Sequence, residues 1–290
     1  MRIAICISGF LRTWEYTKKT FLEQLVDGVE YDLFVHTYYQ NFYEMTAERK
    51  DVKLTIEEIR KQFDGFNLKV LAIEDREEIL PKIFEVTEKY KNVLNYSPLQ
   101  LESSDPNSKS IPIGIRIYDQ LRKIHLCNEL RKSYETLHNK KYDLVIKTRF
   151  DLAYFCKPDW NKCFDNKVHF EYGATFGWPN DTFCACIPEI MDKAYANRFL
   201  FLDEMFFYPK VIKPGLGLCA HGSLGYILDR EKIKIGDPVI NTNCFRSHNS
   251  FQYYENYFKK YELEELYSKL KIINTKNPYE IESRKKEILK

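Results

Sequence analysis

The sequence predicts an α/β protein with a mainly parallel central sheet flanked by helices. Three observations support this fold class. Short, continuous apolar runs rich in β-branched residues, such as Ile3–Ile7, are typical of strands buried on both faces. These runs alternate along the chain with segments of helical periodicity. The links between them are short, which favours right-handed crossovers between parallel strands.

The alternation is regular through about residue 150. Strands are predicted over Ile3–Ile7, Asp32–His36, Leu68–Ile73 and Leu144–Ile146. Helices are predicted over Thr13–Val26, Thr55–Phe63, Asp75–Tyr90 and the apolar positions from Ile117 to Leu137 that recur at steps of three and four. Thr55 and Glu58 offer a capping box for the second helix, and Pro81 lies in the middle of the third, where proline is unfavourable. Between Asn92 and Pro112 the pattern stops, and we expect a polar loop there.

After residue 150 the rhythm weakens, and a mixed α+β half is expected. The predicted elements are strands over Lys167–Tyr172 and Thr182–Ile187, helices over Glu189–Phe207 and Ser223–Arg230, and a charged helical tail over Gln252–Lys290. The eight cysteines form no Cys-x-x-Cys pair, and we expect most of them to be reduced and buried.

The amino-acid composition argues against some classes of function. Lys plus Arg number 44 and Asp plus Glu 42, a net charge of +2 that argues against binding to a nucleic-acid backbone. The 15% aromatic content provides flat surfaces for a core and for stacking on sugars or bases. The apolar run Ile3–Ile7 is too short for the core of a signal peptide, and no run approaches the roughly 20 residues that span a bilayer. We therefore expect a cytoplasmic protein.

Polar and basic residues follow three of the predicted strands. Ser8, Gly9 and Arg12 come after the first strand, His36 ends the second, and Arg149 and Asp151 come after the fourth. In open α/β sheets, ligands bind beyond the carboxyl ends of the strands, so we expect these segments to converge. Strand alternation places Arg149 and Asp151 on the same side. A turn that exposes backbone N–H groups beside guanidinium groups is suited to a phosphate.

Three segments together resemble a known family: Arg2–Trp14, Asp32–Thr37 and Tyr142–Asp151. Their order and spacing are similar to those of GT-A-fold (Rossmann-like) glycosyltransferases found in bacterial capsule and lipopolysaccharide gene clusters and in some large viruses. The resemblance implies a nucleotide-sugar-binding half over residues 1–155. It also implies an acceptor-binding half of the same domain over 156–250, and a helical C-terminal tail over 251–290.

In GT-A enzymes an Asp-x-Asp motif after a central strand holds a divalent metal on the diphosphate of the donor. The matching place here is Arg149-Phe150-Asp151. The resemblance implies that Asp151 binds Mn²⁺ or Mg²⁺, with a late histidine, His221 or His248, as a further ligand. The alternative is that the Arg149 guanidinium neutralises the phosphate itself.

The chemistry of sugar transfer indicates roles for individual residues. Ser8, Gly9, Arg12, His36, Arg149 and Asp151 would bind the donor, by default a UDP-sugar. An inverting reaction needs a general base, for which Asp181 is the candidate, whereas a retaining reaction does not, so the stereochemistry is open. Trp178 is the first candidate for stacking on a sugar or base, and Phe10 and Trp14 are further candidates.

Two other functions remain as alternatives to the glycosyltransferase. One is a catalytically silent nucleotide- or carbohydrate-binding module of the same fold. The other is a different group-transfer enzyme, such as a sulfotransferase, which would need a phosphate loop that the sequence lacks. The acceptor would be an oligosaccharide or a lipid-linked glycan. In the lipid-linked case, basic and aromatic residues of the tail would touch the inner face of the membrane.

Overall fold

The computed structural model describes residues 1–43, 50–88, 113–171, 174–175, 178–179, 181–207, 220–240 and 242–244. Side chains at a few margins of these ranges, including those of residues 172–180, are outside the description. The predicted loop over 92–112, the candidate ligand His248 and the predicted tail over 251–290 also lie outside the described residues.

A five-stranded sheet forms the centre of the protein. Its strands, from one edge to the other, are β11 (Cys184–Cys186), β6 (Leu144–Thr148), β1 (Arg2–Ser8), β2 (Glu30–Tyr38) and β5 (Leu68–Glu74). The pairs β6–β1, β1–β2 and β2–β5 are parallel, whereas β11 runs antiparallel to β6. The predicted α/β class and mainly parallel sheet are therefore confirmed, as are the four strands predicted in the first half.

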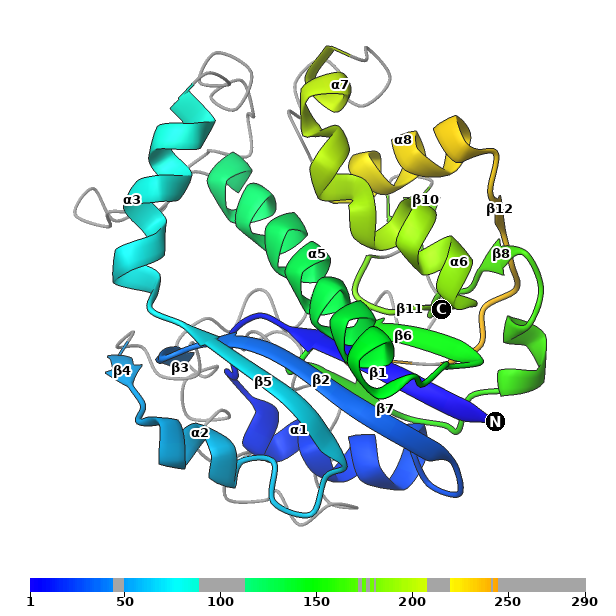
Figure 1. Cartoon of the computed structure of the whole chain (residues 1–290), viewed down its shortest axis with the longest axis horizontal. Helices are drawn as coiled ribbons and strands as arrows, with labels where there is room; N and C mark the ends of the chain where they lie inside the picture. The colour runs from blue at the N-terminus through cyan, green and yellow to red at the C-terminus, as the bar shows by residue number, and fades with distance from the viewer. Residues whose placement is uncertain are drawn as a thin grey trace, which may run out of the picture.

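The order of these strands creates a switch point in the sheet. The chain passes from β1 outward to β2 and β5, and then returns to the other side of β1 to form β6. The return is made by α5 (Ile113–His138), which lies across the sheet in Figure 1. Where strand order reverses, the loops after the two adjacent strands separate and leave a crevice that commonly binds ligands. Here the switch point lies at the carboxyl ends of β1 and β6.

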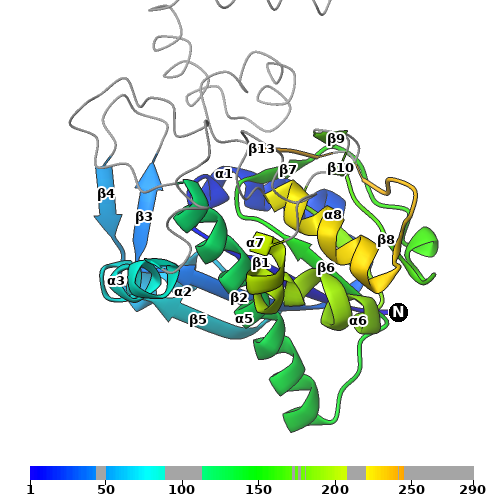
Figure 2. The same ribbon diagram turned by 90° about the horizontal axis from the view of Figure 1, so that it is seen from above.

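Helices cover both faces of the sheet (Figures 1 and 2). Residues of β1 alternate between two buried clusters because successive side chains point to opposite faces. On one face, beside α1 (Trp14–Thr20) and α2 (Ile56–Lys61), the β1 residues are Ile3, Ile5 and Ile7. On the other face Ala4 and Cys6 pack against α5 and α8 (Ala220–Glu231). The protein therefore has two apolar cores separated by the sheet.

The remaining elements are short. The other helical segments are α3 (Arg76–Thr87), α6 (Pro188–Ile190), α7 (Leu202–Phe207), π-helical turns at Phe21–Leu25 and Met191–Tyr195, and 3-10 turns at Trp160–Cys163 and Ala196–Phe201. The minor strand pairs are β3 (Gln40–Tyr43) with β4 (Lys50–Lys53), β7 (Leu152–Tyr154) with β13 (Thr242–Cys244), β8 (Lys167–Val168) with β12 (Lys234–Ile235), and β9 (Ala174–Thr175) with β10 (Trp178–Pro179).

Several predicted elements differ in detail from the structure. The strand predicted over Lys167–Tyr172 is limited to β8, and the helix predicted over Glu189–Phe207 is divided among α, π and 3-10 segments. The capping box at Thr55 and Glu58 is confirmed, with Thr55 Oγ1 accepting from the Glu58 N–H at 3.2 Å. Within the described ranges, no helix is both long and apolar enough to cross a membrane.

Candidate functional site

The loop after β1 is tied to the end of β2. Gly9 has φ +124°, a conformation that favours glycine, and a Cβ there would meet no atom of the described residues within 4 Å. Its N–H donates to the His36 carbonyl at 3.1 Å, and its own carbonyl accepts from the Thr37 hydroxyl at 2.8 Å. The backbone conformation, rather than lack of space, is therefore the reason for glycine in this turn after β1.

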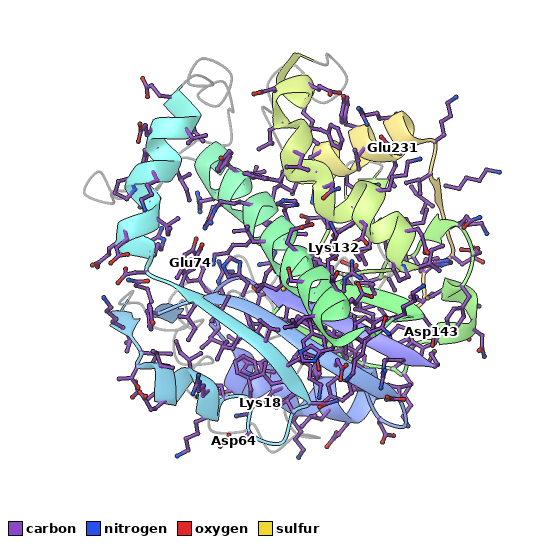
Figure 3. The ribbon with its side chains drawn as sticks, in the orientation of Figure 1. Lys18, Asp64, Glu74, Lys132, Asp143 and Glu231 are labelled. Carbon is purple, nitrogen blue, oxygen red and sulfur yellow. The ribbon has the colours of Figure 1, made fainter. Side chains whose placement is uncertain are left out.

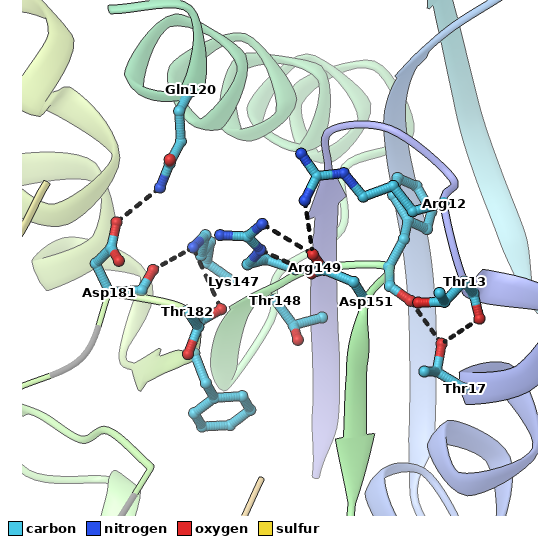
Figure 4. A network of polar contacts seen from close by, with 12 residues as sticks. Arg12, Thr13, Thr17, Gln120, Lys147, Thr148, Arg149, Asp151, Asp181 and Thr182 are labelled. Atoms are coloured by element: carbon cyan, nitrogen blue, oxygen red, sulfur yellow. Dashed lines mark hydrogen bonds and ion pairs between the residues drawn. The ribbon is translucent and has the colours of Figure 1, made fainter. Parts of the chain in front are cut away.

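Arg12 and Arg149 meet at the carboxylate of Asp151 (Figure 4). Arg12 Nη1 donates to Asp151 Oδ2 at 3.0 Å. Arg149 donates to both oxygens of the same carboxylate, from Nε to Oδ1 at 2.9 Å and from Nη2 to Oδ2 at 3.0 Å. Asp151 is only 2% exposed, whereas the side chains of Arg149 and Arg12 are 15% and 21% exposed. The predicted convergence of the loops after β1 and β6 is confirmed.

The turn that carries Arg149 and Asp151 is anchored by contacts of Phe150 with the core and with α1. Phe150, between Arg149 and Asp151, points the other way into the core, where it lies edge-on to Trp14 with the ring centroids 5.5 Å apart. Its carbonyl accepts from the Thr17 hydroxyl of α1 at 2.5 Å. Trp14 is 1% exposed and donates to the Gln62 carbonyl, so the prediction that it stacks on a ligand is wrong. The Trp14 ring instead packs in the core against Phe150 of the site turn.

The two arginines keep Asp151 ionised. Burial favours the neutral acid, but the charges of Arg149 and Arg12 outweigh burial and hold the pKa of Asp151 below its usual range. The three groups therefore form a fixed unit with one more positive charge than negative. We call this unit, Arg12–Asp151–Arg149, the guanidinium pair.

Asp181 lies on the other side of β6, directly before β11, and Lys147 fixes its backbone. The Lys147 ammonium, buried on β6, donates to the carbonyls of Asp181 and Thr182, and the Tyr195 hydroxyl donates to the Asp181 carbonyl at 3.0 Å. Burial lowers the pKa of Lys147 to about 8. Lys147 was not among the predicted site residues, because a lysine directly after the buried run Leu144–Ile146 carries no signal for its contact with Asp181.

The Asp181 carboxylate faces α5 and α8. Its Oδ2 accepts from Gln120 Nε2 at 2.7 Å, and its Oδ1 lies 4.0 Å from Nδ1 of His221. The carboxylate is ionised because the charges of Lys147, Arg198 and Arg149 outweigh burial and lower its pKa. Gln120 was not predicted, because the periodicity of its helix shows which face is buried and not what the opposite face contacts.

Positive charge exceeds negative charge among the described groups at this edge. Four cationic side chains and three carboxyl groups interact here: Arg12, Lys147, Arg149 and Arg198 with Asp151, Asp181 and Glu171. Burial raises the pKa of Glu171 to about 7, so this carboxyl carries only part of a negative charge at neutral pH. One terminal amino group of Arg198, Nη2, is buried without a hydrogen-bond partner in the described part of the chain. An anionic ligand would complete this charge distribution.

The other predicted site residues have different surroundings. His36 is buried, with Nε2 3.5 Å from Glu74 Oε1, and burial lowers its pKa. Glu74, labelled in Figure 3, ends β5 and also pairs with Arg122 and Lys123 of α5. Trp178 contributes its backbone to β10, and its side chain lies outside the description. The donor role of His36 and the acceptor role of Trp178 stay predictions.

The described residues do not fit the predicted metal ion. Both oxygens of Asp151 accept from guanidinium groups, and Arg149 stands where the family motif has an acidic ligand. His221, the second predicted ligand, lies beside Asp181. In the described part of the chain, no group of three or more His, Cys, Asp or Glu side chains could hold a metal ion. A divalent metal ligated by Asp151 and His221 therefore stays a prediction. The described residues do not provide a set of ligands for it.

Comparison of the chain with protein-family models finds no match, and comparison with curated proteins finds no similar sequence. The fold, the geometry of the site and the motif resemblance are therefore the basis for proposing a function.

Proposed function

We propose that the chain is a glycosyltransferase of the GT-A fold that moves a sugar from a nucleotide-sugar donor to a glycan acceptor. The observation that carries the proposal is the guanidinium pair at the switch point of a mainly parallel sheet. A guanidinium fork matches the oxygens of a phosphate, and two forks fixed by one buried carboxylate suit a diphosphate. The motif resemblance over residues 1–155 supports the same class.

The reaction places its largest charge change at the leaving group. The bond between the anomeric carbon and the diphosphate oxygen breaks, and its electron pair stays on that oxygen. A new bond forms between the anomeric carbon and the acceptor hydroxyl oxygen, whose proton is released. Arg12 and Arg149 are held in place before the reaction, so they stabilise the growing negative charge without reorganisation.

Asp181 is the candidate for the acceptor side of the site. Its carboxylate is ionised, Gln120 holds one of its oxygens, and it faces α5 and α8 instead of the guanidinium pair. In an inverting reaction this carboxylate would accept the proton of the acceptor hydroxyl. Trp178 begins β10, shortly before Asp181 in the chain, and would provide a stacking surface for an acceptor sugar.

The proposal extends to the cellular role. The donor is by default a UDP-sugar, and the acceptor is an oligosaccharide or a lipid-linked glycan in surface polysaccharide synthesis. The enzyme would act in the cytoplasm, with peripheral contact at the inner face of the membrane when the acceptor is lipid-linked. These assignments rest on the resemblance.

Screening the purified chain against nucleotide sugars tests the function. Thermal shift identifies the donor that binds, and release of the nucleoside diphosphate in the presence of glycan acceptors reports turnover. We expect one donor class to raise the melting temperature and to be turned over. Asp181→Asn should lower turnover at least about tenfold while donor affinity is retained, because Asp181 acts on the acceptor side.

The possible outcomes separate the candidate functions. A chain that no nucleotide sugar stabilises is not a transferase of this class. Binding of a donor without turnover on any acceptor favours the catalytically silent module. An Asp181→Asn variant with undiminished turnover would remove Asp181 from the mechanism and leave donor binding intact.

A further inference from the structure

We propose that the guanidinium pair takes the place of the divalent metal, so that the chain binds the diphosphate of its donor without a metal ion. This inference rests on the proposed function, because it concerns how that donor is held. In it, Asp151 is a positioning residue that fixes two arginines and is not a metal ligand.

The Asp151 carboxylate is already occupied by guanidinium groups. Oδ1 accepts one guanidinium N–H, and Oδ2 accepts two, at distances between 2.9 and 3.0 Å. A carboxylate offers about four lone-pair sites, of which these contacts already use three. A divalent cation on this carboxylate would lie close to two guanidinium charges, at a residue that is 2% exposed. The repulsion between them opposes metal binding, most strongly where water is excluded.

The two arginines have the chemistry and the exposure that a phosphate ligand needs. Arg149 contacts Asp151 through Nε and one terminal amino group, and Arg12 does so through Nη1. A guanidinium carries five N–H donors in a planar fork, which matches the oxygens of a phosphate as well as those of a carboxylate. Both side chains are partly exposed, whereas the carboxylate beneath them is buried. The diphosphate would therefore meet the guanidinium groups and not Asp151.

The groups around the guanidinium pair also carry positive charge. The Lys147 and Arg198 charges act on the neighbouring carboxylate Asp181 together with Arg149. A metal ion brings two positive charges to an acidic motif, and here the described groups already contain an excess of positive charge. A diphosphate without a metal is the ligand that this charge distribution fits.

Calorimetric titration of the full chain with UDP, GDP, ADP and CDP tests the inference, once in excess EDTA and once in excess Mn²⁺. We expect the nucleotide that binds to have dissociation constants that differ by less than about fivefold between the two conditions. Affinity more than about fivefold higher in Mn²⁺ overturns the inference but leaves the proposed function standing. If no nucleotide binds under either condition, both are overturned.

A second measurement separates the two roles of Asp151. Asp151→Asn keeps one carbonyl acceptor for an arginine and loses the charge. If Asp151 positions the arginines, the variant should bind UDP, or whichever nucleotide the wild-type chain binds, about tenfold more weakly. The loss should be the same in EDTA and in Mn²⁺. A loss of affinity seen only in Mn²⁺ would identify Asp151 as a metal ligand and overturn the inference. The wild-type comparison remains decisive if this variant does not fold.

Discussion

Arg12 has a left-handed backbone conformation, with φ at +44°, where the loop after β1 leads into α1. For a residue other than glycine this conformation costs roughly 1–2 kcal/mol. Strained residues persist where their surroundings hold them, and they are common at functional sites. The contact with Asp151 holds Arg12 in this case. The strained backbone and the ion pair with Asp151 therefore both favour a functional Arg12.

Glu171 gives a pH-dependent prediction at the scale of one residue. It is 2% exposed, accepts from the Thr182 hydroxyl, and accepts from the Phe183 N–H at 3.1 Å. Burial raises its pKa from 4.5 to about 7. Between these values the folded state keeps a proton that the unfolded chain releases, so this group lowers stability as pH rises through the window.

Glu171→Gln should remove that loss. The unfolding free energy of the variant minus that of the wild-type chain should be larger at about pH 8 than at about pH 4.5, by at least about 1 kcal/mol. Urea denaturation at the two pH values measures the change. Glu85→Gln, at an exposed position of α3, is the matched control and should differ from wild type by less than about 0.5 kcal/mol at both. A gain confined to the acidic value would show that the sign is wrong.

The site residues that could be predicted from the sequence lie just after the ends of strands. Ser8, Arg12, Arg149 and Asp151 could be placed together because carboxyl ends of parallel strands share one edge of the sheet. Lys147 and Gln120 could not, since their partners depend on how a later segment, at Asp181, packs beside β6. A single sequence contains no local signal for such a contact.

At the scale of elements, the capping box of α2 provides a stability test. Thr55 Oγ1 accepts from the Glu58 N–H, and Glu58 Oε2 accepts from the Thr55 N–H at 2.7 Å. Thr55→Ala should lower the unfolding free energy by about 1 kcal/mol because the first turn loses an acceptor. Thr136→Ala is the matched control, since the hydroxyl of this exposed residue bonds to the Lys132 carbonyl inside α5.

Denaturant titration of the two variants decides the point. Thr136→Ala should change stability by less than about 0.5 kcal/mol, because alanine is the better helix former. Equal losses for both variants would mean that the capping box contributes nothing beyond the deletion of an exposed threonine.

The segment from Glu189 to Phe207 shows where element prediction fails. Its apolar pattern indicated one helix, but the chain changes from α to π to 3-10 geometry along it. Asn197 Nδ2 donates to the Asp192 carbonyl, and Arg198 Nε donates to the Tyr195 carbonyl at 3.0 Å. These side chains compete for carbonyls that a regular helix would use itself. Periodicity indicates helical structure in such a segment but not its type.

For the whole molecule, the second half of the chain completes structures begun by the first. β11 pairs with β6 at the edge of the central sheet, and β13 pairs with β7. The core beneath α5 combines Ala4 and Cys6 of β1 with residues of α8 such as Leu224. The alternating pattern of the first half predicted the parallel strands. It could not predict an antiparallel edge strand supplied by a segment about 35 residues further on.

The arrangement of the whole sheet also provides a matched control for the site. Arg2 begins β1 at the amino end and pairs with Glu30, with Nη2 2.6 Å from Oε1. Arg149 lies beyond the carboxyl end of the adjacent strand β6 and pairs with Asp151. Both are arginine–carboxylate pairs, but only the second lies at the switch point. In Arg149→Gln, Arg12 still neutralises Asp151, so the fold should be retained.

The most direct measurement is calorimetric titration of the wild-type chain, Arg149→Gln and Arg2→Gln with the nucleoside diphosphate that stabilises the protein. We expect Arg149→Gln to bind about 10- to 100-fold more weakly, because it loses charge-assisted hydrogen bonds to phosphate. Arg2→Gln should bind as the wild-type chain does. Equal affinity in all three proteins would contradict the assignment of the guanidinium pair as the site of the donor diphosphate.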